Sequence, residues 1–148
     1  MEDIKIMTDF NTMNTTTPVT ETITQRFSCR TYIDKPIPEE KKNMVEEFIS
    51  LNKIGPFKTT PRFQLIAASA EDHKSLKGLG TYGFIKGASG FIIGCTERDS
   101  EYNLEDYGYI MERIILFATS IELGTCWLGG SFNKSTFSQK IAAKQDEL

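Results

Sequence analysis

The sequence predicts an α+β fold in which a sheet is layered with helices. Two short apolar runs, residues 63–67 and 91–95, have the length and composition of covered strands. A wide apolar face with helical spacing begins after Asn103 and continues to Ile121. Strands scattered among helices favour such a layered domain over a helical bundle or an all-β sandwich.

The N-terminal part is expected to hold a leader followed by a short helix. Residues 1–18 are rich in Thr, Asn and Met and lack a sustained apolar period, which predicts a flexible leader before a domain of residues 19–148. Apolar residues then recur every four positions and predict one face of a helix that ends between residues 26 and 30: Val19, Ile23 and Phe27. Residues 31–33 have strand-forming side chains.

A second helix is expected after Pro38. The two acids that follow, Glu39 and Glu40, would complement the dipole in its first turn. Residues 55–56 (Gly-Pro) are expected to end it. Its predicted buried stripe has helical spacing: Met44, Val45, Phe48 and Leu51.

The longest helix is predicted to start at Asn103 as its cap, with Glu105 and Asp106 placed in the first turn by the helix dipole. Gly124 is the expected stop. The apolar face comprises Leu104, Tyr107, Ile110, Met111, Ile114, Ile115, Ala118 and Ile121. After it we expect a third strand at residues 125–128 and a last short helix, capped by Asn133 and carrying Phe137 and Ile141.

Composition limits the classes of function. The net charge of −3 and the pI of 5.3 argue against general binding to nucleic acid or anionic membranes, which requires a surplus of cations. The three cysteines are far apart and never form a C-x-x-C pair, so neither a disulfide framework nor a zinc knuckle is expected. Free thiols and the lack of a signal-like or spanning apolar run favour the cytoplasm.

The first candidate binding cluster is Arg26, Ser28 and Arg30. Two guanidiniums four residues apart, with a hydroxyl between them, can converge on a phosphate at the end of a helix. The alternative is that the arginines only solvate the last helical carbonyls. Both interpretations stay open from the residues alone.

A second candidate is the glycine-rich stretch at residues 78–83, which satisfies G-x-G-x-x-G. A dinucleotide fingerprint must follow a strand and open a helix. Here a polar stretch precedes it and a strand follows it, so we expect a connector that approaches a neighbour or ligand closely.

A third candidate is the end of the predicted third strand, Leu128, Gly129 and Gly130. Two glycines leave backbone N–H groups unshielded, so that a flat polar ring could lie against them. The alternative is a strand followed by a tight turn, which explains these residues equally well.

No catalytic side chain and no metal site is predicted. His73 is the single histidine and has polar neighbours, which excludes a His-based metal site or a multi-His relay. Glu105 and Asp106 are better explained by the helix dipole than as a catalytic acid pair.

Five short motifs follow one another along the chain: R-F-S-C-R-T-Y at 26–32, D-K-P-I at 34–37, G-T-Y-G-F-I-K-G-A at 80–88, N-L-E-D-Y-G-Y at 103–109 and G-T-C-W-L-G-G-S-F-N at 124–133. None is decisive alone. In this order and spacing they resemble the nitroreductase family, and within it the putative nitroreductase branch of bacterial and archaeal proteins. The resemblance covers the chain from about Thr22 to its last residue.

The resemblance implies a central, mostly antiparallel sheet layered with helices, and FMN held without a covalent bond at a homodimer interface. It also implies a reaction in two half-steps, in which NAD(P)H reduces the flavin and a nitroaromatic, quinone or similar electron-poor acceptor then takes the electrons. The cofactor would do this chemistry, so no side-chain acid or base is obligatory. The implied FMN contacts are Arg26, Ser28 and Arg30 on the phosphate and ribityl side, and Leu128, Gly129 and Gly130 near the ring.

The chain departs from the family pattern at two places. Many members have a Q-P-W stretch with flavin-contacting amides after the second helix, where this chain has residues 55–61 and offers Lys58 as a substitute donor. Members also continue past the equivalent of Leu148, so a C-terminally incomplete domain is expected. The alternative function is therefore a truncated, non-catalytic homologue that dimerises or binds a nucleotide.

Overall fold

The computed structural model describes residues 17–67, 83–130 and 132–148. In chain order its elements are α1 (Val19–Gln25), α2 (Glu39–Leu51), β1 (Arg62–Ala67), β2 (Gly90–Cys95), α4 (Asn103–Ser120) and α5 (Lys134–Lys140). The predicted α+β class is thereby confirmed. Nearly all of the expected leader, His73 and the glycine-rich stretch before Gly83 lie outside the described residues.

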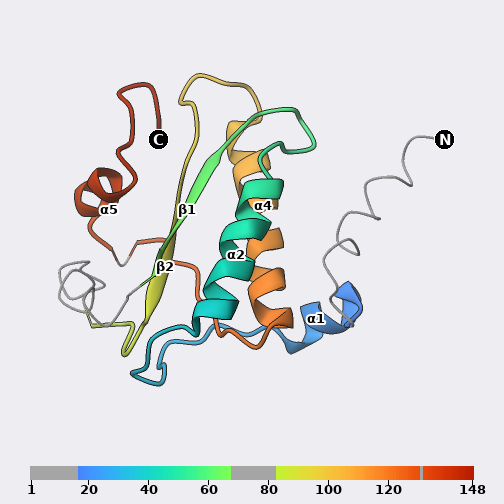
Figure 1. The fold of residues 1–148 in the computed structure, drawn as a ribbon. Coiled ribbons are helices and arrows are strands. Elements are labelled where there is room, and N and C mark those ends of the chain that lie inside the picture. The colour runs from blue at the N-terminus through green and yellow to red at the C-terminus, as the bar shows by residue number, and fades with distance from the viewer. Residues whose placement is uncertain (1–16, 68–82, 131) are drawn as a thin grey trace.

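The strands β1 and β2 form an antiparallel pair, with Arg62 opposite Cys95 and Ala67 opposite Gly90. Both predicted strands are confirmed to within one residue. Figure 1 shows α2 and α4 side by side on one side of the strands and α5 on the other. The sheet is therefore the middle layer of three.

Successive side chains of the strands serve two separate cores, because neighbouring residues of a strand point to opposite faces. Ile92 packs with the cluster under α2 and α4, and Ile93 packs with the cluster under α5. In the first cluster the rings of Phe48 and Phe117 stack with their centroids 4.3 Å apart. The buried members are Val45, Phe48, Ile110, Ile114 and Phe117 in the first cluster, and Ile93, Cys95, Phe137 and Ile141 in the second.

The helix α4 provides the longest buried surface, as its apolar spacing predicts. Its centre is enclosed, with Ile114 fully buried, but Leu104 at its start is 61% exposed. It ends at Ser120 rather than near Gly124, because Glu122 adopts a left-handed backbone (φ 61°) and the Leu123 N–H turns back to the Ala118 carbonyl at 2.8 Å. No helix in the described part of the chain is long and apolar enough to cross a membrane.

The buried face predicted for the first helix is wrong. Thr22 is the buried residue of α1, whereas Ile23 and Phe27 are 55% and 67% exposed. The helix ends at Gln25 and Arg26 is already extended (ψ 130°), so the four-residue spacing no longer describes a helical face at Phe27. Leu51, predicted to be buried on α2, is 66% exposed at the last position of that helix.

The predicted third strand at residues 125–128 is also wrong as a strand. Among the described residues, this segment makes a single isolated β-bridge, between Thr125 and Ser28. The last helix is confirmed as α5, and the Asn133 side chain caps it by accepting hydrogen bonds from the N–H groups of Ser135 and Thr136.

Asp106 binds a loop rather than merely complementing the helix dipole. Its buried carboxylate accepts hydrogen bonds from the Phe57 N–H at 2.9 Å and from the N–H and hydroxyl of Thr59, both at 2.8 Å. Burial alone raises the pKa of Asp106, but these donors and nearby Lys58 outweigh burial and hold the pKa below its ordinary value. The loop between α2 and β1 is thus attached to the first turn of α4.

The C-terminal residues lie against the chain that follows β2. The N–H groups of Arg98 and Leu148 donate to the carbonyls of Asp146 and Thr96 at 2.7 and 2.8 Å. Glu147, whose side chain is 7% exposed, accepts two hydrogen bonds from the Arg62 guanidinium at 2.7 and 2.8 Å. This pairing is the main reason that the pKa of Glu147 falls from an ordinary 4.5 to about 2.

We predict that Asp106→Asn lowers the free energy of unfolding at pH 7 by about 1.5 to 3 kcal/mol, the scale of a hydrogen bond to a charged group. Asparagine loses the charge and offers one acceptor oxygen where Asp106 uses two. Urea unfolding of Asp106→Asn and of Glu105→Gln measures the difference, because both acids lie in the first turn of α4 and Glu105 is exposed. Equal losses in the two variants would mean that the dipole, not the loop, explains Asp106.

We predict an acid-sensitive component of stability from Glu147. Its pKa is lower in the folded chain, so its contribution is present above pH 4.5 and is lost as the pH falls towards 2. Because Arg62 is 43% exposed, solvent screening limits the contribution to about 1 kcal/mol. In urea unfolding between pH 7 and pH 2, Glu147→Gln should lack this component, while the exposed-residue control Glu46→Gln should keep it.

Candidate functional site

Three segments that are distant in sequence lie side by side in the candidate site. Ser28 pairs in parallel with Thr125, and the Cys29 N–H donates to the Thr125 carbonyl at 2.8 Å. Two residues further on, Thr31 pairs in parallel with Lys86, whose N–H donates to the Arg30 carbonyl at 2.9 Å. The arginine cluster is therefore joined by backbone hydrogen bonds to the chain that precedes Gly129.

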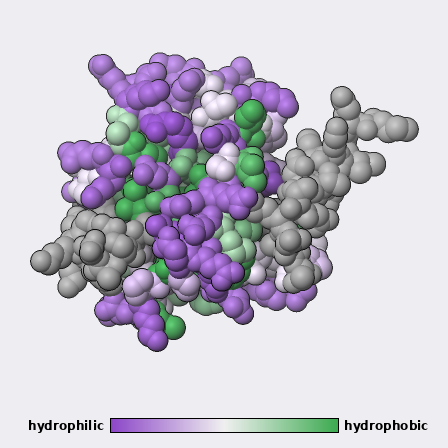
Figure 2. Space-filling model, in the orientation of Figure 1, coloured by the Kyte–Doolittle hydropathy of each residue, from purple (hydrophilic) through white to green (hydrophobic). Residues whose placement is uncertain are grey.

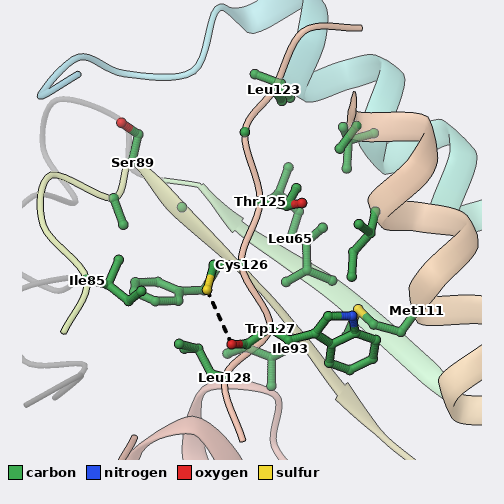
Figure 3. Close-up of a pocket in the computed structure, with 18 of the residues that line it drawn as sticks. Leu65, Ile85, Ser89, Ile93, Met111, Leu123, Thr125, Cys126, Trp127 and Leu128 are labelled. Carbon is green, nitrogen blue, oxygen red and sulfur yellow. Dashed lines mark hydrogen bonds between the residues drawn. The ribbon is translucent and has the colours of Figure 1, made fainter. Parts of the chain in front are cut away.

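A cavity of about 960 Å³ lies beneath the segment 124–128. It is bounded by β2, α4 and α5, and most of its lining is apolar. In Figure 3, Leu65 and Ile93 from the strands and Met111 from α4 surround the segment, whose side chains alternate from Thr125 to Leu128. Figure 2 shows apolar side chains reaching the surface between α5 and the strands, within a polar periphery.

A second cavity, of about 190 Å³, brings two of the predicted site residues together. Arg30 and Leu128, nearly a hundred positions apart in the chain, both line it. The other lining residues are Phe84, Ile85, Cys126 and Trp127. A cationic side chain thus shares this small opening with several apolar side chains.

Arg26 carries buried donors without partners. Its Nε and Nη2 atoms are buried and make no hydrogen bond within the described part of the chain, and the same holds for the Thr125 hydroxyl. A buried guanidinium without acceptors is unfavourable, because desolvation is not compensated. An anion with several acceptor oxygens, such as a phosphate, would supply the missing partners, but Arg26 itself lines neither cavity.

Gly129 and Gly130 border open space. A Cβ built on either glycine meets no atom within 4 Å, and neither has a positive φ. Contacts among the described residues thus do not require glycine at these positions. Ser28 is half-buried, and the contact that positions it is its backbone pairing with Thr125.

Tyr32 is a site residue that sequence reasoning missed. It is half-buried beside Cys29, Cys126 and Arg26. Burial, followed by the two neighbouring thiols, raises the pKa of Tyr32, while the Arg26 guanidinium opposes the rise. In the sequence, Tyr32 could have been recognised only as the last residue of the R-F-S-C-R-T-Y motif.

Trp127 borders both cavities and was not among the predicted contacts. Its indole Nε1–H donates to the Glu112 carboxylate at 2.9 Å, which fastens the segment 124–128 to α4. The indole is 42% exposed and forms part of the wall of the site.

Lys58 is not among the residues that line either cavity. It occupies the turn between α2 and β1 in a left-handed conformation (φ 70°), and its charge interacts with Asp106. Its suggested role as a substitute flavin donor therefore has no support from this geometry. Within the described residues, no group of three or more His, Cys, Asp or Glu side chains could hold a metal ion.

The family of the chain follows from a family model described as "Putative TM nitroreductase", which matches residues 18–148. The chain belongs to this nitroreductase family. The match begins where the predicted leader ends and includes both halves of the candidate site. The resemblance read from the five motifs is thereby confirmed, whereas no curated protein matches the chain.

Solved structures share the fold. A nitroreductase family protein from Clostridium difficile 630 is 21% identical, with a TM-score of 0.65, and the match covers 88% of this chain and 78% of that one. A nitroreductase with bound FMN from Bacteroides fragilis is 19% identical, with a TM-score of 0.62, 89% of this chain and 83% of that one being covered.

An iodotyrosine deiodinase bound to FMN and 3-iodo-L-tyrosine also shares the nitroreductase fold. It is 9% identical, with a TM-score of 0.61, and the match covers 88% of this chain and 84% of the deiodinase. At this identity the likeness concerns the fold alone. One fold therefore serves more than one reaction, so the acceptor has to be argued from the site.

Proposed function

We propose that residues 19–148 form an FMN-dependent oxidoreductase domain that uses NAD(P)H to reduce nitroaromatics, quinones or similar electron-poor acceptors. The observation that carries this proposal is the backbone pairing of the Arg26–Arg30 cluster with the segment that leads to Gly129. Had the two lain on opposite sides of the molecule, one cofactor could not contact both. Membership of the nitroreductase family and the FMN in the Bacteroides fragilis structure support the choice of cofactor.

The phosphate end of FMN fits the Arg26 side of the site. The buried Nε and Nη2 of Arg26 are donors that need acceptors, and phosphate oxygens supply several. Thr125 adds a buried hydroxyl, and Ser28 is its bridge partner. Arg30, beside the smaller cavity, contributes a second cation that balances the remaining charge of the phosphate.

The ring end is assigned to Leu128, Gly129 and Gly130. The glycines leave space in which a flat ring can approach the backbone, because even a Cβ at either position would meet no atom nearby. Trp127 and Leu128 provide apolar surface next to it. Bound FMN would accept hydride from NAD(P)H and pass electrons to the acceptor, while the chain orients it and shields it from water.

We also propose that the enzyme works as a homodimer in the cytoplasm. Large apolar side chains are exposed on α1 and the segment after it, at fractions of 55% to 76%: Ile23, Phe27 and Ile33. A second copy that covers them would remove this apolar surface from water. Cys29, Cys95 and Cys126 are all free thiols, which favours a reducing compartment.

The proposal predicts that the purified protein binds FMN and that Arg26→Ala or Arg30→Ala weakens binding roughly 10- to 150-fold, the equivalent of about 1.5 to 3 kcal/mol for a charged hydrogen bond. Quenching of Trp127, the single tryptophan, during FMN titration measures the affinity. Arg98→Ala is the matched control, since the Arg98 side chain donates to the Glu147 carbonyl near the C-terminal end and belongs to neither of the paired segments. Unchanged affinity in both variants would place the phosphate elsewhere.

Activity is tested separately by NAD(P)H oxidation with a quinone and with a nitroaromatic as acceptor. Turnover that depends on FMN supports the oxidoreductase. FMN binding without turnover would instead favour the second candidate, a non-catalytic nucleotide-binding or dimerising module. A colourless protein that does not take up added FMN would contradict the oxidoreductase.

A further inference from the structure

Two of the three free cysteines occupy neighbouring positions on paired backbone segments. Ser28 is bridged in parallel to Thr125, so the next residue on each segment is a cysteine: Cys29 and Cys126. The Cys29 N–H donates to the Thr125 carbonyl at 2.8 Å and fixes this register. Paired segments lie about 4.8 Å apart, within the Cα separation of about 4.4 to 6.8 Å that disulfides span.

The two thiols also project from the same face of the paired segments. A Cβ built on Gly124 would lie 3.1 Å from both Cβ and Sγ of Cys29, so Cys29 is on the face of Gly124. Side chains alternate along the extended segment, as Figure 3 shows for Thr125 and Cys126, and Cys126 therefore shares that face. Tyr32 lies near both thiols, since each of them contributes to the raised pKa of its hydroxyl.

Neither thiol is committed to a structural role that would prevent its reaction. Both are partly exposed and both line the larger cavity. Their hydrogen bonds are weak ones to carbonyls of their own segments, from Cys29 to Thr31 and from Cys126 to Trp127, each at 3.4 Å. Such weak S–H···O bonds oppose a change of side-chain rotamer only slightly.

We propose that Cys29 and Cys126 form an oxidisable dithiol site that reacts with hydroperoxides to give a reversible intramolecular disulfide. One thiolate attacks the peroxide, so that an S–O bond forms, the O–O bond breaks and water or an alcohol leaves. The second thiol then attacks that sulfur, the S–S bond forms, the S–O bond breaks and water leaves. Two thiols are oxidised and one hydroperoxide is reduced.

Cys95 serves as the internal reference for this selectivity. It is 1% exposed, and burial raises the pKa of its thiol to about 11, so that little thiolate is available. It lies at the end of β2, in the core under α5. The proposal therefore predicts oxidation of two thiols and retention of the third.

The disulfide would join the segment of Arg26 and Arg30 covalently to the segment of Trp127 and Leu128. At present these segments are connected by backbone hydrogen bonds around Thr125. The cross-link closes a long loop of the chain, so the oxidised protein is expected to melt at a higher temperature than the reduced protein. This inference does not depend on FMN or on oxidoreductase activity.

The test treats the reduced full-length protein with equimolar hydrogen peroxide and follows free thiols, intact mass and peptide maps without reduction. We expect two of the three thiols to disappear, the mass to fall by two hydrogen atoms, and a peptide pair joining Cys29 to Cys126; dithiothreitol should reverse all three. Cys95→Ser should behave in the same way. Cys29→Ser and Cys126→Ser should show neither the mass loss nor the rise in melting temperature.

Several outcomes would overturn the proposal. Addition of oxygen atoms to the wild-type protein without loss of two hydrogens would show that the thiols react singly. Cross-linked dimers at low protein concentration would show that they pair between molecules, and a peptide containing Cys95 would show the wrong partner. If a serine variant unfolds, alkylation kinetics of the folded wild-type protein decide: Cys29 and Cys126 should be protected together by peroxide pretreatment and Cys95 should not change.

Discussion

The burial of α4 is the constraint on which the rest of the structure depends. Its side chains fill the core against α2 and the strands, and Ile114 and Phe117 are almost completely removed from water. Each end of this rigid element then positions another part of the chain. At the start, Asp106 binds the loop that carries Phe57 and Thr59, and after the end Thr125 pairs with Ser28. Because the helix cannot shift without opening the core, both attachments occur at defined places, and the candidate site inherits its geometry from them.

The candidate site combines a polar and an apolar part that the chain holds together through its backbone. Arg26 and Arg30 supply cations on one segment, while Trp127 and Leu128 supply apolar surface on the other. This division matches a ligand with an anionic end and a flat ring, which is the chemistry of FMN. Membership of the nitroreductase family agrees with it. The likeness to an iodotyrosine deiodinase shows that the fold itself does not select the acceptor. Selection has to come from the walls of the cavities, where Tyr32 and Trp127 were not predicted.

The errors of prediction have physical causes in particular residues. Ile23 and Phe27 have the spacing of a buried helical face, but α1 ends at Gln25, so the periodicity continues into extended chain and both side chains are exposed. Residues 125–128 have strand-like composition, yet they are attached by a single bridge and by the Trp127–Glu112 hydrogen bond. From the local sequence, Asp106 is explained as an acid that complements the helix dipole. Its hydrogen-bond partners lie about fifty positions earlier in the chain, so the residues around Asp106 do not reveal them.

The sequence by itself determined the α+β class, the two strands, the long helix, the Asn133 cap and the family, because each rests on local spacing or on motifs in order. Local patterns suffice there, since strand and helix periodicities are set by neighbouring residues. Only the tertiary structure decided that Arg30 and Leu128 line one cavity, and that two nitrogens of Arg26 are buried without acceptors among the described residues. It also decided that the segment of Ser28 and Cys29 pairs with Thr125. Those facts depend on which distant segments pair, and pairing is decided by the packing of the whole core rather than by the residues that meet.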